Sequence, residues 1–117
     1  MEDINKLSEK ISYEDFKKVE IKVGKIISAE KIPDTDKLLK LMVDFAEGLP
    51  RQIVSGIALY FPDLSELIDK KCMFVANLEP RTIKGFESNG MILAVGEGDS
   101  FSLLEPKQEI LPGSSAR

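Results

Sequence analysis

Basic side chains in two turn-rich segments are the residues of this sequence whose types and spacing could do chemistry. Lys31 and Lys37 lie on either side of a turn at residues 33–36. Arg81 and Lys84 stand three positions apart in a later segment that contains proline and glycine. Loops of this kind can aim cationic side chains at successive phosphate groups, and a planar guanidinium can hold a phosphate with two hydrogen bonds. The pattern favours the binding of a phosphate-bearing ligand.

Residues that commonly carry catalysis are scarce. The sequence contains no histidine, which removes the commonest general acid or base and the commonest neutral metal ligand. Cys72 is the single cysteine and lies in the apolar run 72–76, so we expect a buried thiol rather than a nucleophile. Residues 96–100 lack the lysine of a phosphate loop and are expected to form a hairpin turn. We therefore predict a protein that is not an enzyme and that needs no cofactor or metal.

The distribution of charge supports a local basic surface. Between Lys17 and Lys40, seven lysines outnumber four acids, whereas residues 97–109 hold four acids and one lysine. The formal net charge of -4 argues against coating nucleic acid through bulk positive charge. A basic patch, to which Lys22 is also assigned, can nevertheless persist within an acidic chain.

Length and composition favour one soluble domain. The chain has 117 residues, of which 43% are hydrophobic and 31% charged, and this length can bury a core unaided. No apolar run is long enough to cross a membrane, and the polar, acidic start lacks the layout of a secretory signal. We expect a cytoplasmic protein with a flexible segment at residues 1–11 and one domain at residues 12–117.

The domain is expected to begin with a helix and to continue as strands. Ser12 is a typical helix cap, with Asp15 three positions further on. Alternating apolar and polar residues, together with turn signals, predict strands at residues 19–24, 39–45, 51–56, 71–78, 91–95 and 101–104. Gly24 suggests a bulge or a sharp bend in the first strand. The spacing of Leu64, Leu67 and Ile68 predicts a short helix between the third and fourth strands.

This element order predicts an all-β fold, a five-stranded OB-fold barrel with short helices and terminal extensions. The loops between strands one and two and between strands four and five flank the binding face of such barrels, so residues 29–38 and 77–91 should lie together. Four phenylalanines are expected at packing positions, namely Phe16, Phe45, Phe74 and Phe101. With few aromatic rings left to stack on bases, recognition should rest on phosphates and folded shape.

Several dispersed motifs carry a resemblance to a known family. They are Val23-Gly24, Ala29-Glu30, Lys37-Leu38, Val43-Asp44, residues 51–58, Asn77-Leu78, Pro80, Gly85 and Ser88-x-Gly90-Met91. Over residues 13–112 the chain resembles the tRNA-binding domains found at the carboxyl end of methionyl-tRNA synthetases and as free-standing proteins. The resemblance implies an OB barrel that binds the outer corner of tRNA, not its anticodon.

The resemblance also implies further site residues and partners. Asn77 and Ser88 would hydrogen-bond to sugar or phosphate, and Met91 would contact a base or ribose. The complete predicted tRNA-binding set is Lys22, Lys31, Lys37, Asn77, Arg81, Lys84, Ser88 and Met91.

Two copies are expected to pair through the terminal extensions, which would cover Leu103, Leu104, Ile110 and Leu111. A methionyl-tRNA synthetase catalytic chain stays open as a partner. The alternative function is that of the CsaA-like members of the family, which are linked to protein export and to binding of unfolded polypeptides.

Overall fold

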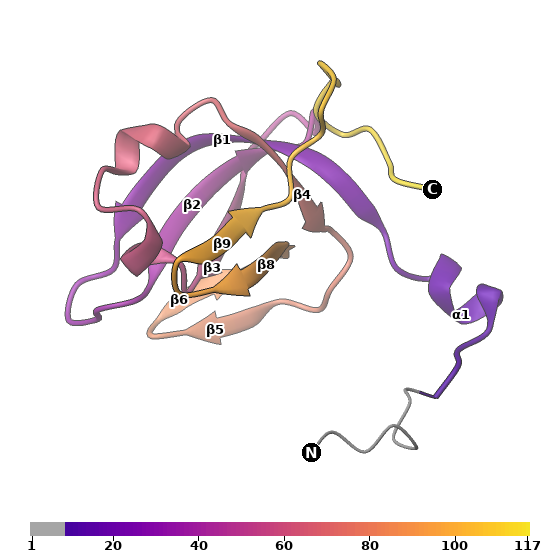
Figure 1. Cartoon of the computed structure of the whole chain (residues 1–117), viewed down its shortest axis with the longest axis horizontal. Coiled ribbons are helices and arrows are strands. Elements are labelled where there is room, and N and C mark those ends of the chain that lie inside the picture. The colour runs from indigo at the N-terminus through magenta and orange to yellow at the C-terminus, as the bar shows by residue number, and fades with distance from the viewer. Residues whose placement is uncertain (1–8) are drawn as a thin grey trace.

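The computed structural model describes residues 9–117, which form an all-β barrel (Figure 1). Five antiparallel strands make one sheet in the order β3-β2-β1-β4-β7. They are β1 (Ile21–Lys31), β2 (Leu39–Asp44), β3 (Arg51–Ser55), β4 (Lys71–Val75) and β7 (Met91–Ile92). The all-β, five-stranded barrel predicted from the sequence is confirmed.

Strand β1 curls so that it can serve both halves of the sheet. Its first part pairs with β4 and its second with β2, and Lys25 has partners on both. The register shifts between Ile26 and Ser28, so the bulge predicted at Gly24 lies further along the strand. Gly24 has a different role, because a Cβ atom there would lie 2.5 Å from Val43 Cγ1. The missing side chain makes room for core residues.

The barrel core follows the alternation read from the sequence. In β2 and just beyond it, Leu39, Leu41, Val43 and Phe45 are all buried. The Phe45 ring meets the Phe74 ring edge-on, with centroids 5.3 Å apart. The other buried cluster members are Ile26, Ile53, Ile57, Ala58, Leu67, Cys72, Ile92 and Leu103. Leu103 is therefore covered within the chain, whereas Leu111 of the same predicted patch is 77% exposed.

The barrel closes between β3 and the residues that precede β7. Asn89 N–H donates to Gln52 O at 2.9 Å. Ser88 Oγ accepts from the buried Val54 N–H at 2.9 Å and donates to Gly90 O at 3.1 Å. Closure thus depends on a side-chain hydroxyl as well as on backbone pairing.

Two 3₁₀ turns replace the single helix predicted between the third and fourth strands. They are η1 (Ala58–Tyr60) and η2 (Leu64–Leu67). A 3₁₀ turn places residues three apart on one side, so Leu64 and Leu67 both pack inward while Ile68 is exposed. Asp63 begins η2 by accepting a hydrogen bond from Ser65 N–H at 3.0 Å.

Two hairpins also differ from the predicted elements. The segment expected as an extended loop contains β5 (Arg81–Ile83) and β6 (Phe86–Ser88), which pair with each other. The predicted strand 91–95 is interrupted at Leu93, whose N–H donates to Met73 O at 3.0 Å. Beyond it, β8 (Ala94–Glu97) and β9 (Ser100–Leu103) form a hairpin around the predicted glycine turn.

The two ends of the described chain lie at one side of the barrel (Figure 1). Helix α1 (Tyr13–Lys17) begins at Ser12, whose Oγ accepts from Asp15 N–H at 3.0 Å as predicted. Phe16 is 48% exposed, so its predicted packing role is wrong for this chain alone. No helix of residues 9–117 is long and apolar enough to cross a membrane.

The segment after β9 returns to β1. Val23 N–H donates to Ser114 O at 2.9 Å, Gly113 N–H donates to Val23 O at 2.8 Å, and Ala116 N–H donates to Ile21 O at 2.8 Å. These bonds cover the edge of β1 where β2 has already ended. Most of the predicted flexible segment 1–11 lies outside the described residues.

Candidate nucleic-acid interface

The two basic segments singled out in the sequence meet at one end of the barrel. Lys37 of the β1–β2 loop and Lys84 of the β5–β6 hairpin line the same shallow hollow, of about 290 Å³, together with residues 34–36 and Leu38. In Figure 1 the loop and the hairpin tip point to the same side, away from α1. Lys31 precedes this loop at the end of β1. The expectation that the two segments lie together is confirmed.

The β1–β2 loop has a defined shape because it is tied at its base. Ile32 N–H donates to Leu38 O at 3.1 Å, and Thr35 Oγ1 donates to Ile32 O at 2.8 Å. Ile32 itself is buried, while Asp34 has a positive φ of 64° that reverses the chain. The loop therefore presents Lys37 from a fixed backbone.

The β5–β6 hairpin holds Lys84 at its tip. Ile83 pairs with Phe86, which leaves a two-residue turn in which Lys84 and Gly85 have φ values of 51° and 85°. Positive φ at both positions is the geometry whose twist matches a β-hairpin. Lys40 of β2, which the sequence analysis did not select, lies 5.5 Å from the Phe86 ring centroid. This contact helps to hold the hairpin against the barrel.

Ion pairing separates the cations of the barrel into two groups. Between residues 11 and 106 of the described chain, eight cationic side chains lie within 4.0 Å of a carboxylate. They are Lys17, Lys18, Lys22, Lys25, Lys40, Arg51, Lys70 and Lys71. The cations of this range without such a carboxylate among the described residues are Lys31, Lys37, Arg81 and Lys84, and all four are exposed. Their charge is free to attract a polyanion.

Arg81 and Met91 border a second hollow, of about 80 Å³, at the base of the same hairpin. Met91 is 46% exposed, so its side chain is accessible. Ser88 also borders this hollow but is only 5% exposed, and its hydroxyl is occupied by Val54 and Gly90 as described above. The structure therefore places Ser88 in the barrel wall, where it supports the hairpin.

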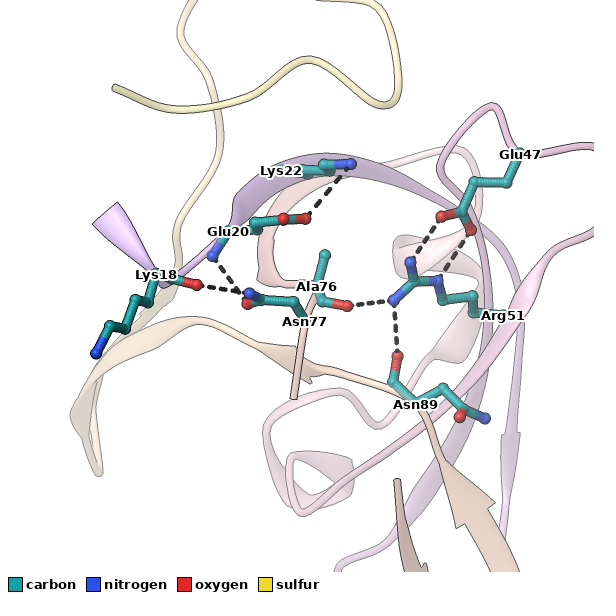
Figure 2. Close-up of polar contacts among 8 residues, drawn as sticks. All are labelled: Lys18, Glu20, Lys22, Glu47, Arg51, Ala76, Asn77 and Asn89. Carbon is teal, nitrogen blue, oxygen red and sulfur yellow. Dashed lines mark hydrogen bonds and ion pairs between the residues drawn. The ribbon is translucent and has the colours of Figure 1, made fainter. Parts of the chain in front are cut away.

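Polar groups of neighbouring residues already engage the side chains of Lys22 and Asn77 (Figure 2). Asn77 Oδ1 accepts from Glu20 N–H at 2.9 Å, and Asn77 Nδ2 donates to Lys18 O at 2.6 Å. Lys22 Nζ lies 3.8 Å from Glu20. Strand geometry puts Lys22 up to about 30 Å from Lys31 along β1. Asn77 thus fastens the α1–β1 connection to the end of β4.

Arg51 is a structural residue that the sequence analysis grouped only with a family motif. Its guanidinium donates to Ala76 O and, at 3.3 Å, to Asn89 O, and it holds Glu47 with two bonds of 2.6 and 2.9 Å (Figure 2). The Arg51 hydrogen bond lowers the pKa of Glu47, and the same bond raises the pKa of Arg51. In the sequence, the feature that could have indicated these Arg51 contacts is an arginine at the start of an apolar strand.

Two kinds of catalytic group, a metal cluster and a reactive thiol, were sought among the described residues. No group of three or more His, Cys, Asp or Glu side chains in residues 9–117 could hold a metal ion. Cys72 is fully buried, and burial raises the pKa of its thiol to about 12. A thiol in this environment stays protonated and unreactive at neutral pH.

The fold is a small antiparallel barrel with two basic segments that meet at one end. Residues 21–115 match the model of a family described as putative tRNA binding domain. The chain belongs to this family. It is a non-catalytic tRNA-binding domain.

Several relatives by sequence are methionine–tRNA ligases. The enzyme of Methanoregula boonei is 53% identical over 98% of this chain, and that of Helicobacter pylori strain 26695 is 50% identical over 89% of it. These matches cover 17% and 16% of the two ligases. The chain therefore spans about a sixth of the length of the ligases that it matches.

Solved structures of differently described proteins share the fold. A protein of Pyrococcus horikoshii described as related to methionyl-tRNA synthetase superposes with a TM-score of 0.84 at 39% identity, covering 93% of this chain and 99% of that one. The CsaA chaperone of Picrophilus torridus superposes with a TM-score of 0.82 at 31% identity, covering 92% and 100%.

Proposed function

We propose that Lys31, Lys37, Arg81 and Lys84 form the tRNA-binding surface, which we call the cationic face. The observation that carries this proposal is that, between residues 11 and 106, these four cations have no carboxylate of the described residues within 4.0 Å, whereas the other eight cations do. Lysines and arginines bind phosphates with release of counterions, and a carboxylate beside a cation lowers the local positive potential. We assign the barrel to the OB class, in which these loops border the ligand.

Of the other four predicted residues, one is proposed to touch the RNA and three are proposed to act through the fold. Met91 is exposed beside Arg81, and we propose that it touches a ribose or base at the edge of the face. The side-chain polar atoms of Asn77 and Ser88 form hydrogen bonds with other groups of the chain. Lys22 is paired at the other end of β1. We propose that these three act on binding only through the fold.

We further propose that the domain supplies tRNA to a methionyl-tRNA synthetase in the cytoplasm. The identity of 53% to a region of a methionine–tRNA ligase supports this assignment. Phosphate contacts fix position without reading sequence, so the domain should add affinity for many tRNAs. Choice of the correct tRNA would belong to the catalytic chain.

Self-association is proposed through the chain ends. Tyr13, Phe16, Val19 and Ile21 line an apolar hollow of about 360 Å³ together with the last residues of the chain. Leu111, which lies six residues before the end of the chain, is 77% exposed. A second copy would cover these side chains, and sedimentation at micromolar concentration should therefore show a dimer.

The likeness to CsaA chaperones supports a second candidate function, the binding of unfolded polypeptides. The two functions are separated by measuring affinity for two unrelated tRNAs, for a DNA duplex and for a reduced, unfolded protein. The tRNA-binding proposal predicts similar affinity for both tRNAs and weaker binding of the other two ligands. Binding of unfolded protein without binding of either tRNA would reject it in favour of the chaperone function.

A further inference from the structure

An aromatic cluster lies between η1 and β9, outside the cationic face. The rings of Tyr60 and Phe101 stack with centroids 3.7 Å apart and planes 7° from parallel. Phe61 meets Phe101 edge-on at 6.1 Å. Phe61 and Phe101 pack against the core, whereas Tyr60 is 36% exposed. The cluster is a supported aromatic surface with one ring accessible to a ligand.

A hollow of about 320 Å³ opens beside this cluster, within the size range of small-molecule sites. Besides the three rings, the charged residues that line it are Lys70, Asp99 and Glu105. Lys70 Nζ lies 3.3 Å from Glu105, while Asp99 has no cationic side chain of the described residues within 4.0 Å. The hollow combines an aromatic wall with carboxylate oxygens that accept hydrogen bonds.

The hollow lies close to the cationic face. Ala58 N–H, at the start of η1, donates to Lys37 O at 2.9 Å, and Tyr60 follows two residues later. A phosphate held by Lys37 would therefore have its own base or the next one within reach of Tyr60. The acids of the hollow disfavour a phosphate inside it, which leaves the base as the part of the nucleotide that fits.

We propose that this hollow receives one unstacked nucleobase of the bound tRNA, an inference that rests on the proposed function. Any base can stack on an aromatic ring. Bases with an exocyclic amino group, such as cytosine through N4, can in addition donate to a carboxylate such as that of Asp99. A basic peptide would also suit aromatic rings and acids, but the free lysines next to the hollow would repel it.

Replacing Tyr60 with leucine tests the stacking contact. Loss of stacking should weaken tRNA binding at least about fivefold. The slope of log affinity against log salt should stay unchanged, because no counterion is involved. Tyr60→Phe keeps an aromatic ring and should bind as the parent does. Lys37→Gln should instead lower the salt slope, which separates the phosphate contact from the base contact.

A fluorescent probe at the same position identifies the ligand. The chain has no tryptophan, so Tyr60→Trp creates a single reporter, whose emission should be quenched by tRNA and not by an arginine-rich peptide. Parent-like binding by Tyr60→Leu at every salt concentration overturns the base site while leaving the cationic face intact. Quenching by the peptide alone overturns it in favour of a protein ligand. If the parent binds no tRNA, both the base site and the proposed function fail.

Discussion

Replacing Ser88 with alanine should weaken the barrel far more than it weakens RNA recognition. The substitution leaves the Val54 N–H without an acceptor inside the barrel wall, where Ser88 and Val54 are 5% and 7% exposed. A buried donor left unsatisfied costs about 1–3 kcal/mol. With a loss of about 2 kcal/mol and an unfolding entropy of roughly 2.1 cal/mol/K per residue, the unfolding midpoint should fall by about 8 °C.

Thermal and urea unfolding measure this loss, and tRNA titration at 10 °C measures recognition by the folded fraction. Ser102→Ala is the matched control, because its hydroxyl is bonded only to the adjacent Leu103 O, so its effect should stay within about 0.5 kcal/mol. Unchanged stability of Ser88→Ala together with a large loss of tRNA affinity would refute this reasoning. That result would show that the Ser88 hydroxyl contacts the RNA directly.

Three further predictions concern the core and its clamps. Gly24→Ala should cost about 1–3 kcal/mol in urea unfolding, because the new Cβ would lie 2.5 Å from Val43; a stability equal to the parent would contradict the close packing. Arg51 lowers the pKa of Glu47, so the carboxylate stabilises the fold above its unfolded-state pKa and loses this effect as pH falls. The small stability gap between the parent and Glu47→Gln should thus close between about pH 5 and pH 3. Because the pKa of Cys72 is raised to about 12, a thiol reagent at pH 8 should label it only after denaturant is added; fast labelling of the folded protein would show an accessible thiolate.

Strand alternation and turn residues predicted a five-stranded barrel, and the family motifs distinguished it from other small barrels. The repeat of Leu39, Leu41, Val43 and Phe45 has one physical solution, a strand with one face buried. The role of Gly24 could not be predicted from the sequence, because a glycine in a strand is compatible with either a bulge or a close approach of neighbouring side chains. Only the packing of β1 against β2 and β4 distinguishes the two.

The candidate site was predictable where charge and turn chemistry coincide. Lys37 and Lys84 were selected as loop cations, and the structure brings them to one hollow. The pairing of Lys22 follows from strand alternation, which puts Glu20 and Lys22 on the same side of the chain. Ser88 could not be recognised as a wall residue from sequence, because its partner Val54 lies 34 positions away.

The salt dependence of tRNA binding tests the cationic face most directly. A variant that combines Lys31→Gln, Lys37→Gln, Arg81→Gln and Lys84→Asn removes the four free charges, and asparagine suits the positive φ at the hairpin tip. A control of equal charge replaces four paired lysines with glutamine, namely Lys17, Lys18, Lys25 and Lys71.

The slope of log affinity against log salt is measured for the parent and both variants by fluorescence titration. Each phosphate contact releases somewhat under one counterion. Loss of four contacts should therefore lower the magnitude of the slope by about 3 in the variant that lacks Lys31, Lys37, Arg81 and Lys84, and by much less in the control. Equal slopes for the two variants would contradict the assignment of tRNA binding to this face.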